Sequence, residues 1–139
     1  MTDATSEKNN ATTQHMTLRF ELFVDDPQKS VAFYTDVLGF KIASSHERYW
    51  SLQRDSIVIG IGYTEKLVEG HYFRPEILTT RKGLGIEIVF EVDDIKAFYE
   101  AVKATGYSIH EELTERKWGL TDFRIADPDG YYLRPTSRN

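Results

Sequence analysis

The 139-residue chain contains no cysteine, which excludes disulfide bonds, thiolate nucleophiles and cysteine-based zinc sites. It also has no apolar run of about 18 residues, the length that a membrane-spanning helix needs. Nor does it carry an excess of positive charge: the formal net charge of −5 lacks the basic surface expected of a nucleic-acid binder. We therefore expect a cytoplasmic protein that binds neither nucleic acid nor a membrane.

What is present is the composition of a folded domain, with 40% hydrophobic and 13% aromatic residues. Residues 1–16 differ, being rich in Thr, Asn, Asp and Glu with no apolar segment. They resemble neither a secretory signal nor an Arg-rich transit peptide. We predict a disordered tail over 1–16 and a single domain over 17–139.

The domain shows the same pattern twice. A strand pattern over 18–24 precedes a helix that begins at Asp26-Pro27 and ends at Gly39, and three short strands follow over 40–45, 49–53 and 56–62. The second half gives a strand over 86–92, a helix ending at Gly106, and strands over 108–114, 122–126 and 131–134. Val24-Asp25-Asp26 recurs as Val92-Asp93-Asp94. We predict an α+β fold of two βαβββ modules, 17–62 and 86–137, joined by the loop 63–85.

Two motifs carry a resemblance to a known family. The first is FELFVDDPQKSVAFYTDVLGF over 20–40, and the second is Trp118-Gly119, Asp122-Phe123-Arg124 and DPDGY over 127–131. They resemble the opening and closing signatures of the glyoxalase/bleomycin resistance protein/dioxygenase (vicinal oxygen chelate) superfamily, closest in style to its bleomycin-resistance-like members. The resemblance implies that each module curls a four-stranded sheet around a concavity that holds a small organic ligand. It also implies a homodimer, in which one cleft can take its two modules from different chains.

The resemblance further implies where a metal would bind. Enzymes of the superfamily hold a divalent ion with His and Glu residues on the first and last strands of each half. The matching positions in this chain are Arg19, Gly60, Glu87 and Arg134. Arginine stays protonated and offers no lone pair, so we expect no metal and no other cofactor. An enzyme of the lyase, isomerase or dioxygenase class remains an alternative, with Glu21 and Glu87 as ligands or bases and His110 within reach.

Charged and aromatic side chains are the candidate ligand-binding groups. By strand periodicity, Arg19, Glu21, Glu87 and Arg134 face the cleft, either as the polar floor of a ligand site or as ion pairs that close a purely structural module. Trp118 and the run His71–Phe73 in the loop 63–85 are candidate aromatic walls, although the loop can equally be a plain linker. We predict a non-catalytic binding protein that sequesters an aromatic or cationic compound, as in antibiotic resistance.

Overall fold

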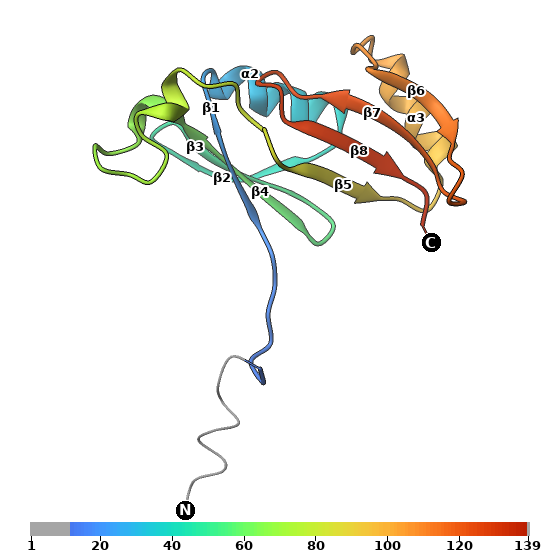
Figure 1. Ribbon diagram of the computed structural model, residues 1–139, viewed down its shortest axis with the longest axis horizontal. Helices are drawn as coiled ribbons and strands as arrows, with labels where there is room; N and C mark the ends of the chain where they lie inside the picture. Colours follow the sequence, from blue (N-terminus) through green and yellow to red (C-terminus); the bar gives the residue numbers. More distant parts are fainter. Residues whose placement is uncertain (1–11, 139) are drawn as a thin grey trace, which may run out of the picture.

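The computed structural model describes residues 12–138, which form two four-stranded sheets (Figure 1). The first module contains β1 (Phe20–Val24), α2 (Pro27–Ala32), the π-helical turn η1 (Phe33–Val37), β2 (Lys41–His46), β3 (Tyr49–Arg54) and β4 (Ile57–Tyr63). The second contains β5 (Glu87–Glu91), α3 (Ile95–Ala104), β6 (Glu111–Glu115), β7 (Thr121–Ala126) and β8 (Tyr132–Thr136). Of the predicted tail, residues 1–11 lie outside the described part. No helix within 12–138 has the length and hydropathy needed to cross a membrane.

The two sheets share one topology. Their strand orders are β1-β4-β3-β2 and β5-β8-β7-β6. In each, the first strand runs parallel to the last, and the remaining pairs are antiparallel. The α+β fold of two βαβββ modules is therefore confirmed.

The helices begin and end where their capping residues predict. Asp26 accepts a hydrogen bond from the backbone N–H of Lys29 (3.3 Å), and Asp94 accepts one from Ala97 (3.1 Å). Gly39, with φ of +77°, supplies the left-handed residue after the first helix. The first helix is not uniform, because its α-helical turn passes into the π-helical turn η1.

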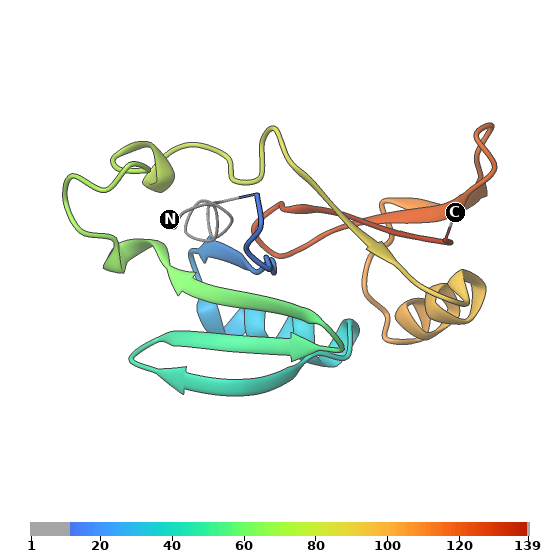
Figure 2. The same cartoon turned by 90° about the horizontal axis from the view of Figure 1, so that it is seen from below.

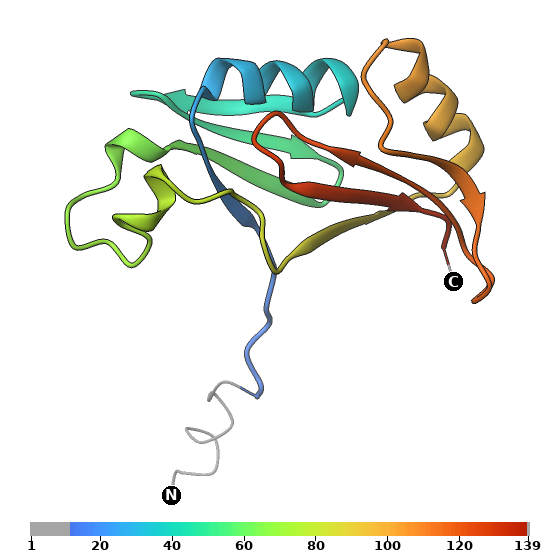
Figure 3. The same ribbon diagram turned by 45° about the horizontal axis from the view of Figure 1, so that its top comes forward.

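Each sheet has one face packed in the core and one open face. In β1, Leu22 and Val24 are buried while Glu21 is exposed, and β5 alternates in the same way. Helix α2 lies along the core side of the first sheet (Figure 3). Because strand side chains alternate, the charged residues of β1 and β5 are left on the open faces.

The turn between β7 and β8 joins the two modules. The Tyr34 hydroxyl donates to Asp127 (2.7 Å), and Asp129 accepts from the Asp25 backbone N–H (3.1 Å) and the Ser30 hydroxyl (3.2 Å). The Tyr131 hydroxyl donates to the Phe23 carbonyl oxygen (2.9 Å). The DPDGY motif thus ties the second module to α2 and β1, which lie beside this turn (Figure 3).

Replacing Tyr34 with phenylalanine is expected to weaken this junction by about 1–3 kcal/mol, because a buried carboxylate oxygen loses its donor.

Burial raises the pKa of Asp127, and the Tyr34 hydrogen bond lowers it and offsets part of that rise. The folded state therefore binds more protons than the unfolded state between the ordinary and the raised pKa, and stability falls as pH rises through that window. Because Tyr34→Phe removes the hydrogen bond that lowers the pKa of Asp127, it should raise that pKa further and extend this pH window upward. Carboxyl NMR titration would show the pKa, and urea unfolding at several pH values would show the stability. An unchanged Asp127 pKa would contradict it.

Candidate functional site

Three side chains form a closed cluster on the open face of the first sheet. Arg19 donates to Glu21 through Nε (2.8 Å) and to the Tyr49 hydroxyl through Nη2 (2.7 Å). The Tyr49 hydroxyl donates in turn to Glu21 (3.0 Å). Burial, together with the hydrogen bond to Glu21, raises the pKa of Tyr49, so the hydroxyl remains a donor at neutral pH. The Glu21 carboxylate is therefore held by two neighbours and is not a free base.

Gly60, on the neighbouring strand β4, pairs with Glu21 across the sheet. A Cβ atom at this position would overlap the Tyr49 hydroxyl and the Glu21 carboxylate, and would lie 2.8 Å from Glu21 Cδ. The Arg19–Glu21–Tyr49 cluster therefore fills the space that a side chain at position 60 would take, so a larger residue there would displace the Glu21 and Tyr49 side chains. The cluster occupies the place of one expected metal ligand.

The open face of the second sheet carries a larger network around a fully buried carboxylate, Asp122. Arg116 donates to it through Nε (2.9 Å), while Arg124 Nη2 lies 3.4 Å and Arg134 Nη1 3.8 Å away. Glu87 contacts Arg134 Nε (3.2 Å) and Arg124 Nη1 (3.6 Å). Three guanidinium groups thus converge on one buried carboxylate, and two of them, those of Arg124 and Arg134, also share Glu87.

The predicted polar floor is divided between the modules. Arg19 meets Glu21 in the first module, and Arg134 meets Glu87 in the second. Among residues 12–138, no ion pair joins one of these pairs to the other. The prediction left out Tyr49, Arg116, Asp122 and Arg124. The alternation of Asp122 and Arg124 along β7 was the available signal, since it places both on one face with Arg134.

The residues do not fit a divalent metal. Within the described residues, no group of three or more His, Asp or Glu side chains is placed to hold one. Arg19, Gly60 and Arg134 supply no donor, and both Glu21 and Glu87 are engaged by arginine. His110 was expected within a strand over 108–114, but β6 begins only at Glu111, and the His110 ring packs edge-on against Tyr132 (5.6 Å).

A groove of about 700 Å³ lies between β1 and the segment 64–85. The segment crosses from β4 to β5 (Figure 2). The Phe23 ring packs against the rings of His71 and Phe73, with ring centroids 5.9 Å and 5.4 Å apart. These contacts bring the segment close to the sheet. The groove has aromatic walls and charged groups along its edges. The aromatic residues that line it are Phe20, Phe23, Tyr72, Phe73 and Tyr131, and the charged ones are Glu21, Glu76, Arg81 and Lys82.

One carboxylate, that of Asp25, holds both ends of this segment. Its Oδ1 accepts from the Thr64 hydroxyl (3.1 Å) at the beginning of the segment and contacts Lys82 Nζ (2.9 Å) near its end. The Lys82 side chain is only 6% exposed, so its charge depends on Asp25 for compensation. The segment is thereby fastened over β1 as a cover and is more than a linker.

The groove contains part of the predicted site. Glu21 and Phe73 line it, and the His71 ring packs against the Phe73 ring. Glu87 and Arg134 belong to the second sheet and do not line it. Trp118 is 61% exposed in the turn between β6 and β7, so it forms no wall of this groove.

Comparisons with known proteins agree with the fold of two βαβββ modules. A family model described as the Glyoxalase/Bleomycin resistance protein/Dioxygenase superfamily matches residues 14–134. A probable lactoylglutathione lyase of Vibrio parahaemolyticus is 31% identical over 120 residues, which cover 81% of this chain and 83% of that protein. The uncharacterized protein YetH of Bacillus subtilis is 31% identical over 113 residues, covering 78% and 87%. A glyoxalase/bleomycin resistance protein/dioxygenase from Nocardioides shares the fold, with a TM-score of 0.76 at 16% identity over 96% of this chain and 89% of that one.

Proposed function

The chain belongs to the Glyoxalase/Bleomycin resistance protein/Dioxygenase superfamily, and we propose that it binds and sequesters a small aromatic compound, without a metal, in the groove between β1 and the segment 64–85. The observation that carries this proposal is the groove itself. Its volume of about 700 Å³ suits a drug-sized molecule, and five aromatic side chains line it. Planar ligands stack well on such walls.

One acidic group of the groove can meet a ligand that bears a positive charge. Glu76 lines the groove and has no ion pair among residues 12–138, whereas Glu21 is paired with Arg19 and the Lys82 ammonium with Asp25. Arg81 is the remaining cationic lining residue. An aromatic cation could place its ring against Phe23 and Phe73 and its charge near Glu76, so binding would combine stacking with a charge contact.

Sequestration is favoured over the chemistry that some relatives' names suggest. Relatives are named lactoylglutathione lyase, yet Arg19, Gly60 and Arg134 stand where superfamily enzymes have metal ligands. Catalysis by a general base without a metal is also disfavoured, because the carboxylates of Glu21 and Glu87 are both bound by arginine. Homodimerisation is part of the same proposal, since Leu84 and Ile86, two apolar residues of the groove lining, remain exposed in the single chain and could be covered by a second copy.

The proposal is tested by titrating the protein with a planar cationic acridine dye, followed by dye fluorescence and calorimetry. Phe73→Ala should weaken binding about tenfold, the loss of one stacked ring together with its buried area. Trp118→Ala is the matched control and should leave affinity unchanged, because Trp118 lies outside the groove. Equal losses in the two variants, or no binding by the wild type, would contradict the proposal.

Elemental mass spectrometry tests the other half of the proposal. Protein purified without chelators and challenged with nickel, zinc, manganese and iron(II) should retain no stoichiometric metal. Retained metal that is lost in Glu87→Ala would overturn a metal-independent function.

A further inference from the structure

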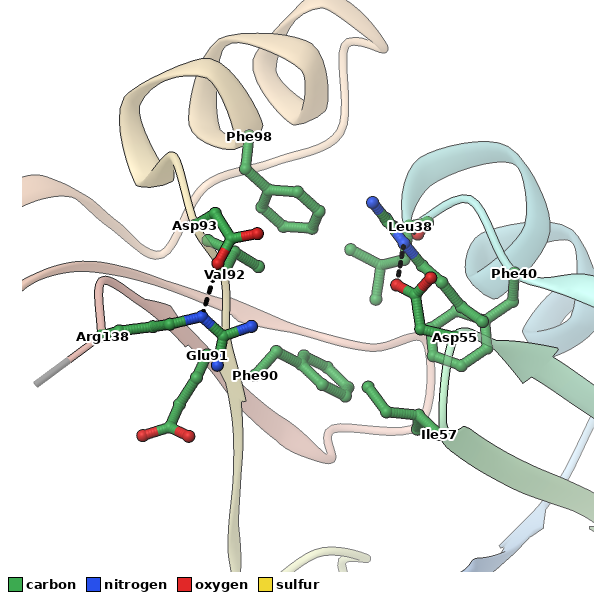
Figure 4. A pocket seen from close by; sticks show the side chains of 11 residues that line it. Leu38, Phe40, Asp55, Ile57, Phe90, Glu91, Val92, Asp93, Phe98 and Arg138 are labelled. Carbon is green, nitrogen blue, oxygen red and sulfur yellow. Dashed lines mark hydrogen bonds and ion pairs between the residues drawn. The ribbon is translucent and has the colours of Figure 1, made fainter.

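A second hollow lies between the two modules, away from the groove. Its volume is about 150 Å³, and it shares no lining residue with the groove. Leu38, Phe40 and Ile57 come from the first module, and Phe90, Val92 and Phe98 from the second (Figure 4). An occupant would therefore contact both modules at once.

The size and lining of the hollow define what can enter it. A cavity of about 150 Å³ lined by apolar side chains accepts one benzene-sized group. The Phe90 and Phe98 rings border this space from opposite sides (Figure 4). An aromatic ring or a branched aliphatic side chain would fit between them, whereas a fused drug-sized ring system would not.

The rim carries charges of both signs. On the second module, Arg138 Nε donates to Asp93 (2.7 Å). On the first, Arg54 Nε lies 3.8 Å from Asp55, and its Nη1 donates to the Leu38 carbonyl oxygen (2.6 Å). The two pairs stand on opposite sides of the hollow (Figure 4).

The Asp93–Arg138 pair is available to a ligand. Its side chains are 90% and 55% exposed, and ion pairs this exposed contribute little to stability, so they separate readily. Arg54 is more firmly placed, because its guanidinium also lies over the Phe98 ring at 5.2 Å. An apolar floor beside one exposed cation, Arg138, and one exposed anion, Asp93, matches a molecule with an apolar end and a zwitterionic end.

We propose that this hollow binds a free α-amino acid with a benzene-sized apolar side chain. The side chain lies between Phe90 and Phe98, the α-carboxylate binds Arg138, and the α-ammonium binds Asp93. Each part of the ligand then meets the chemistry that it requires, and the exposed ion pair is exchanged for two equivalent ones.

The test is a titration of isotope-labelled full-length protein, followed by NMR, with four probes. L-Phenylalanine should shift the amides of Ile57, Val92 and Phe98 at millimolar concentration. Phenethylamine lacks the carboxylate and 3-phenylpropionate lacks the ammonium, so each should bind about threefold to fivefold more weakly. Glycine lacks the apolar group and should cause no shift at these amides.

Two charge-neutralising variants at exposed positions sharpen the test. Arg138→Gln should weaken L-phenylalanine and 3-phenylpropionate but not phenethylamine, and Asp93→Asn should weaken L-phenylalanine and phenethylamine but not 3-phenylpropionate. Lys103→Gln, which breaks a comparably exposed pair with Glu112, is the matched control and should change nothing. Equal binding of all three aromatic probes, or shifts confined to groove residues such as Phe73, would overturn the proposal. Neither result bears on dye binding in the groove, which the Phe73→Ala variant reports separately.

Discussion

Replacing Asp25 with asparagine is expected to release the segment 64–85 from β1 and to abolish ligand binding in the groove. The Asp25 carboxylate holds Thr64 and Lys82, at the two ends of the segment. Without its charge, the buried Lys82 ammonium loses its ion-pair partner and keeps the more distant Asp129 carboxylate as a negative neighbour, at a cost of about 2–3 kcal/mol. Because the segment forms one wall of the groove, we expect the affinity for ligand to fall more than the free energy of unfolding.

Hydrogen–deuterium exchange should show the release directly. Amides over 71–82 should exchange faster in Asp25→Asn, while those of β5 and β8 remain protected. Trypsin should also cut sooner after Arg81, which lies within the segment. Asp36→Asn is the matched control, because Asp36 is an exposed carboxylate of η1 outside the segment, and it should leave exchange over 71–82 unchanged. Lys82→Met, which removes the buried charge but keeps the apolar stem, should restore protection to the Asp25→Asn background. If Asp25→Asn alone left exchange over 71–82 unchanged, the segment would be held by its aromatic contacts instead.

The fold could be predicted from the sequence because its signals are local and repeated. Asp26 and Asp94 cap helices through their own side chains, and Gly39 and Gly106 end them with positive φ. Strand alternation then placed Leu22 inside and Glu21 outside. Such signals depend only on neighbours within a few residues, which is why they remain readable without the structure.

The site could be predicted only in part, because its contacts connect distant segments. The recurrence of Val24-Asp25-Asp26 identified Asp25 as half of a repeat, but its bonds to Thr64 and Lys82 depend on where the segment 64–85 returns to the sheet. Trp118 was expected to form an aromatic wall, but it is exposed and does not line the groove. The expectation that no metal binds rests on residue identity alone, since arginine cannot be a ligand whatever the tertiary structure, and it stays a prediction.

Asparagine in place of Asp122 is expected to cause the largest loss of stability in the chain, about 3–5 kcal/mol. Asp122 is fully buried and carries the negative charge shared by Arg116, Arg124 and Arg134. Neutralising it leaves three guanidinium groups with only Glu87 and Glu111 to balance them. Like charges held this close in a poorly solvated place repel one another strongly. The loss should appear as a lower midpoint in urea unfolding with an unchanged slope.

The comparison with Glu111→Gln identifies the origin of this loss. Glu111 pairs with the same Arg116, but its side chain is 44% exposed, so its neutralisation should lower the urea midpoint far less than that of Asp122. Adding Arg124→Met to Asp122→Asn should recover part of the stability, because it removes one of the unbalanced charges and the Nε that has no partner among the described residues. Recovery would mean that the balance of charge around position 122 stabilises the open face of the second sheet. If the two substitutions were additive instead, Asp122 would stabilise the sheet through its individual hydrogen bonds rather than through the balance of charge.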